Sequence, residues 1–265
     1  MTRFYTIASG SSGNAALLSW GDTHLLIDMG ISCQRLTKAL AELGLKPGDL
    51  SAILITHEHA DHIGGLATYI KKYHTPILCT PGTGYQLVYR LAGIEPLLRP
   101  VPMGKSVTMG RMTISTLPTS HDCRESAAFR VDTPDGAVGY LTDTGYVLQD
   151  TGERLLGAEL LVLESNHDVD MVREGPYPYA LKQRVLGSQG HLSNEDAGRY
   201  AAASALAGTR TIVLAHLSDK NNTPQAALTA VRRCLESAGC TPHLVVAPKL
   251  GLSEEILLEG AVCRR

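Results

Sequence analysis

The sequence lacks features that would assign it to two common classes of protein. It has no excess of positive charge, because 24 Lys and Arg residues are balanced by 26 Asp and Glu residues, which gives a net charge of −2. This balance argues against a protein that coats nucleic acid through bulk positive charge, but it allows an enzyme whose metal ions supply local positive potential. No apolar run approaches the roughly 18 residues of a membrane span, so we expect no membrane association.

Signals for disulfide bonding and secretion are also missing. The six cysteines are scattered and form no C-x-x-C pair: Cys33, Cys79, Cys123, Cys234, Cys240 and Cys263. Residues 1–7 enter a strand-like pattern at once, without the apolar segment of a secretory leader. We therefore expect reduced thiols and a cytoplasmic protein.

Linkers, repeats and low-complexity segments are absent too, so we expect one domain over residues 1–265. Short aliphatic runs typical of buried strands, such as residues 52–55, alternate with amphipathic helical patterns, such as residues 32–43. We also expect a helix over residues 65–73. This mixture of strands and helices predicts an α+β fold.

Chemically active side chains are concentrated directly after the predicted strand at residues 52–55. His57, His59 and His62 lie within six residues, together with Asp61. If the chain stays extended, alternate residues project to one side, and imidazole nitrogen and carboxylate oxygen are both zinc ligands. A polar surface loop would explain one histidine but not three with an interleaved aspartate. The cluster therefore predicts a metal site at the end of a strand.

Two other segments are candidates for binding phosphate. Residues 9–14, Ser-Gly-Ser-Ser-Gly-Asn, offer backbone N–H and hydroxyl donors, although the same residue types form ordinary hairpin loops. Ser193 begins a predicted helix with a capping box, and a helix N-terminus also favours an anion. Residues 175–179, followed by Lys182 and Arg184, form either a wall for base stacking or a loop covering the core.

The run from His57 to His62 resembles the H-x-H-x-D-H signature of the metallo-β-lactamase superfamily. The longer pattern is similar to the YycJ/WalJ-like branch of bacterial 5′→3′ exonucleases. That narrower resemblance is carried by residues 9–14, 163–168, 190–194 and 214–218. It implies a four-layer αββα sandwich, the metallo-β-lactamase fold.

The resemblance also implies a set of metal ligands. His57, His59 and His121 would hold one metal ion, and Asp61, His62 and His216 would hold a second, with Asp143 between them. Asp28 would fix a ligand through a hydrogen bond. The two divalent ions would be zinc, with manganese as an alternative, since both metals accept nitrogen and oxygen ligands.

The implied reaction is hydrolysis of a phosphodiester by a hydroxide that bridges the two metals. Asp61 would orient this nucleophile, and His191 would protonate the departing 3′-oxygen or bind the phosphate. The residues expected to bind substrate come from three segments: Ser11, Ser12, Gly13, Asn14, Asn166, His167, Ser193 and Asn194.

The implied function is a 5′→3′ DNA exonuclease that takes part in DNA repair. Hydrolysis of a small cyclic phosphodiester stays open, because no large nucleic-acid-binding domain is inserted and the net charge is −2. Acyl or thioester hydrolysis would need an apolar acyl pocket, which the sequence does not indicate. A binding scaffold without enzymatic activity would be expected to lose at least one metal ligand. The full set of metal ligands therefore argues against this alternative.

Overall fold

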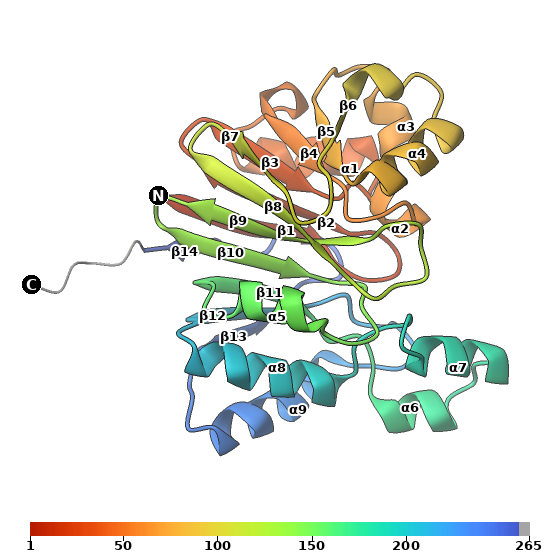
Figure 1. Cartoon of the computed structure of the whole chain (residues 1–265), viewed down its shortest axis with the longest axis vertical. Coiled ribbons are helices and arrows are strands. Elements are labelled where there is room, and N and C mark those ends of the chain that lie inside the picture. The colour runs from red at the N-terminus through yellow and green to blue at the C-terminus, as the bar shows by residue number, and fades with distance from the viewer. Residues whose placement is uncertain (260–265) are drawn as a thin grey trace, which may run out of the picture.

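The computed structural model describes residues 1–259, so Cys263 lies outside the described residues. Within this range, two seven-stranded mixed sheets pack face to face (Figure 1). In spatial order, the first sheet contains β14 (Ile256–Leu258), β1 (Thr2–Ala8), β2 (Ala15–Trp20), β3 (Thr23–Ile27), β4 (Ala52–Leu54), β5 (Ile77–Cys79) and β6 (Leu98–Pro100). The second contains β13 (His243–Val246), β12 (Thr211–Ala215), β11 (Leu160–Glu164), β10 (Gly136–Leu141), β9 (Ala127–Thr133), β8 (Met112–Pro118) and β7 (Ser106–Met109).

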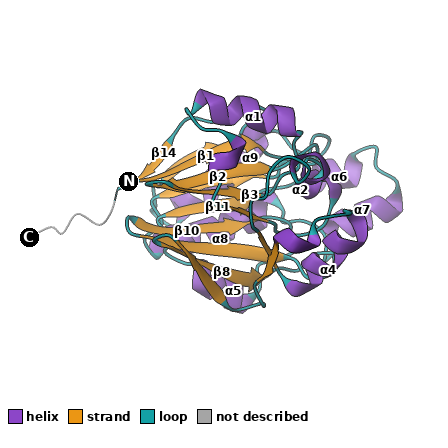
Figure 2. Cartoon of the chain, turned by 90° about the horizontal axis from the view of Figure 1, so that it is seen from above, coloured by secondary structure: helices purple, strands orange, loops and turns teal. Residues whose placement is uncertain are grey.

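Helices cover the outer face of each sheet and one end of the sandwich (Figures 1 and 2). The α-helices are α1 (Cys33–Glu42), α2 (Ala60–Ile63), α3 (Leu66–Tyr69), α4 (Pro81–Arg90), α5 (Gln149–Leu155), α6 (Val169–Glu174), α7 (Tyr179–Leu186), α8 (Asn194–Leu206) and α9 (Pro224–Ser237). Two short 3₁₀ helices, η1 (Pro47–Asp49) and η2 (Glu95–Leu97), precede β4 and β6. No helix in residues 1–259 is long and apolar enough to cross a membrane.

Strand alternation explains the three apolar layers of the core. Successive side chains of a strand point to opposite faces. In β11, Leu160 and Val162 accordingly pack between the two sheets, whereas Leu161 and Leu163 pack under α8 and α9. A third layer lies between the first sheet and α1. This arrangement confirms the four-layer αββα sandwich.

The parallel strands determine where the polar loops meet. β3, β4, β5 and β6 run parallel in the first sheet, and β10, β11, β12 and β13 run parallel in the second. The carboxyl ends of these strands carry Asp28 after β3, His57 after β4, Asp143 after β10 and His216 after β12. Loops from distant parts of the chain therefore converge on one end of the sandwich.

The structure differs from the sequence prediction in several elements. The helix expected over residues 65–73 is limited to α3, and α2 precedes it. Gly65 lies between them, and this position requires glycine because a Cβ there would lie 2.1 Å from the backbone oxygen of Ile31. The helices α5, α6 and α7 and the strand β14 were not predicted.

Candidate metal centre

The structure brings together all seven residues expected to bind metal. In each set of three, the potential ligand atoms lie within 4.8 Å of one another. The sets are His57, His59 and His121; His57, His62 and Asp143; and Asp61, His62 and His216. The sets share residues, so they form one continuous site.

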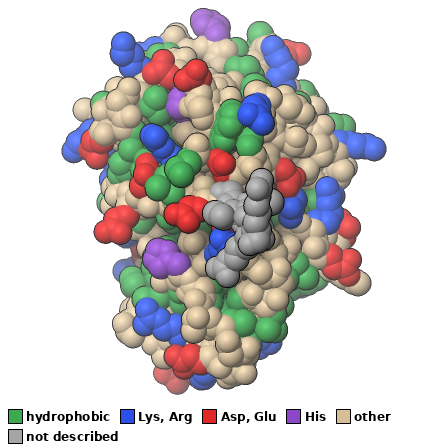
Figure 3. Space-filling model, turned by 90° about the vertical axis from the view of Figure 1, so that its left-hand side faces the viewer, with side chains coloured by type: hydrophobic (Ala, Val, Ile, Leu, Met, Phe, Trp, Pro, Cys, Tyr) green, Lys and Arg blue, Asp and Glu red, His purple; other side chains and the backbone are tan. Residues whose placement is uncertain are grey.

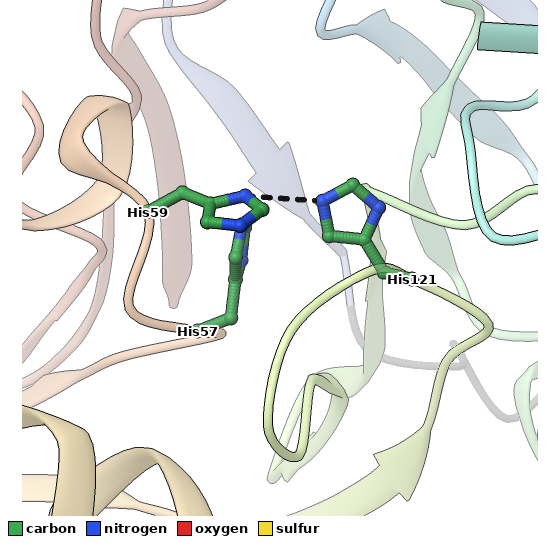
Figure 4. Close-up of side chains that lie close together, drawn as sticks. All are labelled: His57, His59 and His121. Carbon is green, nitrogen blue, oxygen red and sulfur yellow. Dashed lines mark hydrogen bonds between the residues drawn. The ribbon is translucent and has the colours of Figure 1, made fainter. Parts of the chain in front are cut away.

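One half of the site contains only imidazole groups. His59 Nδ1 and His121 Nε2 lie 3.2 Å apart, and the ring of His57 lies beside them (Figure 4). His121 Nδ1 donates to the backbone oxygen of Gly190 at 3.1 Å, which leaves Nε2 free to bind a metal. Burial lowers the pKa of His57 well below its usual value and also lowers the pKa of His59. These rings are therefore neutral, as a metal ligand must be.

The other half combines imidazoles with carboxylates. Asp61 Oδ2 lies 3.3 Å from His62 Nε2 and 3.3 Å from His216 Nε2. Behind these rings, His62 Nδ1 donates to Asp28 Oδ2 at 2.8 Å, and His216 Nδ1 donates to Glu164 Oε1 at 3.0 Å. Burial alone would lower the pKa of His216, but Asp143 and the other carboxylates raise it to about 10. A cation bound here would take the place of that proton.

Asp143 lies between the two halves. Its Oδ2 is 3.3 Å from His62 Nε2, and its Oδ1 is 3.7 Å from His121 Nε2. Although Oδ2 is buried, it has no hydrogen-bond partner, and the same is true of His57 Nε2. Buried polar atoms without partners are rare, and a cation would satisfy both. The residues present therefore fit divalent metal ions.

Left-handed backbone at non-glycine residues marks this site. In residues 1–259, the non-glycine residues with positive φ are Asp28 (59°), Asp143 (56°) and His216 (56°). Each follows the carboxyl end of a parallel strand by one or two residues. Such conformations cost about 1–3 kcal/mol each and persist where the surrounding structure enforces them. Here they turn each side chain into the site.

Glu164 belongs to the site, although the sequence analysis gave it no role. It is fully buried at the end of β11, and its Oε1 lies 2.8 Å from His191 Nδ1. Its Oε2 accepts hydrogen bonds from the backbone N–H groups of Thr144 and Leu192. Burial alone would raise the pKa of Glu164, but His191 and His216 hold it below its usual range. Its position at the end of a buried strand was the available signal.

His191 lies at the edge of the metal site. Its side chain is 20% exposed, and its ring centroid is 5.1 Å from that of His121 and 5.2 Å from that of His216. Because Nδ1 is bonded to Glu164, the ring orientation is fixed and Nε2 remains available to a substrate.

The loop after β1 is divided between the surface and the metal site. Ser11 and Ser12 are exposed. Gly13 has a φ of 147°, and a Cβ there would lie 2.9 Å from a backbone oxygen. Asn14 is buried, and its Nδ2 lies 3.1 Å from His62 Nε2 and 3.3 Å from Asp61 Oδ2. Asn14 therefore lies against two of the expected metal ligands, whereas the two serines are accessible to a phosphate.

The four remaining residues that were expected to bind substrate are all buried. Asn166 Nδ2 donates to the backbone oxygen of His216, and burial lowers the pKa of His167 to about 4. Ser193 caps α8, and Asn194 Oδ1 accepts a hydrogen bond from Ser165. In this structure Asn166, His167, Ser193 and Asn194 thus lie behind the site, and their contact with substrate stays a prediction.

The fold and the site define a metal-binding member of a known superfamily. Residues 23–217 match the family model described as "Beta-lactamase superfamily domain". The chain therefore belongs to the metallo-β-lactamase superfamily, as its sequence signature predicted.

More particular similarities lie within this superfamily. The chain is 37% identical to the exodeoxyribonuclease WalJ of Streptococcus pneumoniae serotype 2 (strain D39 / NCTC 7466) over 228 residues, 85% of each sequence. It is 35% identical to the exodeoxyribonuclease YycJ of Bacillus anthracis over 237 residues, 89% of this chain and 90% of the relative. The fold is similar to the metallo-β-lactamase fold protein YhfI from Bacillus subtilis, with a TM-score of 0.71 and 20% identity. That superposition covers 96% of this chain and 100% of the other. The resemblance to the YycJ/WalJ-like branch is thus confirmed.

Proposed function

We propose that this chain is a metal-dependent phosphodiesterase that removes nucleotides from the 5′ end of DNA. The observation that carries the proposal is the convergence of seven potential ligands, two of which carry buried atoms without hydrogen-bond partners, His57 Nε2 and Asp143 Oδ2. The names of the two exodeoxyribonuclease relatives support DNA as the substrate.

Two divalent ions fit this site, and we propose zinc, with manganese as an alternative. When bound, such ions would lower the pKa of a water at the site and neutralise charge on the phosphate. The all-imidazole half would hold one ion, and Asp61, His62 and His216 would hold the other. Asp143 lies close to both halves and would bridge them.

We propose His191 as the group that protonates the leaving oxygen. When the bond between phosphorus and the 3′-oxygen breaks, that oxygen gains negative charge and needs a proton. His191 Nδ1 is hydrogen-bonded to the carboxylate of Glu164, so Nε2 is the atom that would deliver the proton. The exposed hydroxyls of Ser11 and Ser12 would hold a phosphate at the neighbouring rim.

The experiment that tests this function compares two substrates with one preparation loaded with zinc or manganese. We expect immediate release of a labelled mononucleotide from a duplex labelled at its 5′ end, and no release after treatment with EDTA. Cleavage of a cyclic nucleotide without degradation of DNA would overturn the exonuclease and favour the small-molecule alternative.

We also propose the cytoplasm and DNA repair as the setting of this activity. The five cysteines in residues 1–259 are free, in keeping with a reducing compartment. Fractionation of cells and their sensitivity to DNA-damaging agents after deletion of the gene would test both points.

A further inference from the structure

Helix α4 exposes an aromatic face. Tyr85, Val88 and Tyr89 are 66%, 42% and 84% exposed, and their i, i+3, i+4 spacing places them on one side of the helix. The opposite side is anchored in the core by Leu87, which is fully buried. The exposed rings are therefore not needed for packing of the helix, which leaves them available to a binding partner.

Hydrogen bonds attach α4 to the loop that carries the metal ligands. Arg90 Nη1 donates to the backbone oxygen of Glu58 at 2.7 Å, and Glu58 separates His57 from His59 in the chain. The backbone N–H of Arg124, three residues after His121, donates to Glu58 Oε1 at 3.0 Å. The C-terminal end of α4 is thus fixed beside the all-imidazole half of the site.

The N-terminal end of α4 is attached to the same region. Gly82 N–H donates to Glu125 Oε2 at 2.6 Å, and a Cβ at Gly82 would lie 2.6 Å from the Cβ of Glu125. The hydroxyls of Thr80 and Thr83 both donate to the backbone oxygen of Glu125. The aromatic face is therefore held at a fixed position relative to the metal site, next to the turn that follows His121.

An exposed arginine borders this face. The guanidinium of Arg124 lies 5.4 Å from the centroid of the Tyr85 ring, and α4 itself contains no acidic residue. The carboxylates of Glu58 and Glu125 accept hydrogen bonds from backbone N–H groups. By contrast, the face shown in Figure 3 mixes acidic and basic side chains without a patch of one sign.

We propose that Tyr85, Tyr89 and Arg124 form a stacking platform for the single-stranded DNA that leads into the metal site. Aromatic rings stack on any base, and an adjacent arginine contacts the ring or the phosphates, so such a surface binds a strand without sequence preference. The proposal rests on the exonuclease function proposed above, because a small cyclic substrate would not extend to α4. An exposed apolar surface without charge would instead be suited to binding a partner protein. The position of Arg124 beside Tyr85 favours a nucleic acid as the partner.

Binding to the metal-loaded protein tests the platform directly. The probe is a 12-nucleotide oligo-dT with phosphorothioate linkages and a fluorescein at its 3′ end, followed by fluorescence anisotropy. The double variant Tyr85→Ala/Tyr89→Ala should bind at least about tenfold more weakly, because each stacked base loses its partner. Tyr85→Phe/Tyr89→Phe keeps both rings and should stay within about twofold of the wild type. Leu206→Ala, which removes a 69% exposed side chain on α8, is the control for loss of surface apolar groups.

Hydrolysis assays separate failure of the platform from failure of the proposed function. Activity on single-stranded DNA should fall at least tenfold in the alanine variant relative to its activity on bis(p-nitrophenyl) phosphate, with the loss appearing mainly in KM. Wild-type protein that hydrolyses this small diester but neither binds nor degrades DNA would overturn the exonuclease and the platform together.

Two results would overturn the platform alone. One is degradation of DNA by the wild type together with equal DNA affinity in the alanine variant. The other is an alanine variant that keeps its DNA affinity but elutes as a monomer in size-exclusion chromatography where the wild type elutes as a dimer. This result would assign the α4 face to self-association.

Discussion

The two halves of the metal centre hold their histidines by different means. In one half, the Nδ1 atoms of His62 and His216 donate to the buried carboxylates of Asp28 and Glu164 at 2.8 and 3.0 Å. A carboxylate behind an imidazole fixes the ring and raises its basicity as a ligand. This half is therefore built to hold a cation firmly.

In the other half, neutral groups take the place of carboxylates. His121 donates to the backbone oxygen of Gly190, and His57 Nδ1 lies 3.1 Å from the hydroxyl of Thr56. A neutral acceptor orients the ring but adds less negative charge. We therefore expect this half to bind its ion more weakly. The comparison predicts that two halves of one site can differ in metal affinity through the groups that hold their ligands.

The largest expected effect comes from removing the residue that both halves share. Asp143→Ala should lower phosphodiesterase activity by about 10³-fold or more, because several kcal/mol of charge stabilisation depend on the metals. Metal analysis should show loss at both halves. Wild-type turnover in this variant would contradict the bridging role, and loss of only one ion would assign Asp143 to one half.

The next effect separates chemistry from metal binding. His191→Ala should keep its metal content but lose about 10²–10⁴-fold in activity on DNA, the usual contribution of a general acid. The variant His243→Ala, at the edge strand β13, serves as a control. If both variants were equally active, His191 would be only a structural neighbour of Glu164.

A smaller effect tests the carboxylate behind His62. Asp28→Asn should weaken binding of the ion at the His62 half by about 10–100-fold, as is usual for partners of metal ligands. A competition titration with a chromophoric chelator measures the affinity, and anomalous diffraction identifies the half that loses its ion. The exposed Asp22→Asn is a matched control. Loss of the ion from the all-imidazole half instead would show that Asp28 supports that half rather than the His62 half.

The smallest expected effect is the difference in affinity within the wild-type protein. Stepwise addition of EDTA should remove the two ions in separate steps, with the all-imidazole half losing its ion at about tenfold lower chelator concentration. Metal analysis after each step, together with diffraction, follows the order. Simultaneous loss of both ions would show that Asp143 couples the halves too strongly for them to act separately.

The sequence predicted the site best where its ligands are adjacent in the chain. The run from His57 to His62 identified a metal site from its residue types alone. His121, Asp143 and His216 are isolated in the sequence, and only the family resemblance placed them in the site. Their convergence depends on parallel strands that end at the same edge, which is a property of the whole fold.

Other features depended on burial, which the sequence did not reveal. Glu164 orients two histidines only because β11 carries it into the interior. Asn194 had the residue type of a phosphate ligand, but its amide is enclosed by Ser165 and Asn222. The strand β14 has three residues and is defined by its pairing with β1, so no local pattern indicated it.

Three residues at strand ends have a left-handed backbone conformation, and at these positions stability and activity place opposite demands on the sequence. Glycine adopts this conformation at no steric cost, so a glycine at Asp28, Asp143 or His216 would relieve strain while deleting a functional group. At Asp143, whose Oδ2 has no hydrogen-bond partner, a library screened only for heat tolerance or soluble yield would therefore favour glycine. Engineering of this hydrolase needs a selection for turnover alongside any selection for thermal robustness.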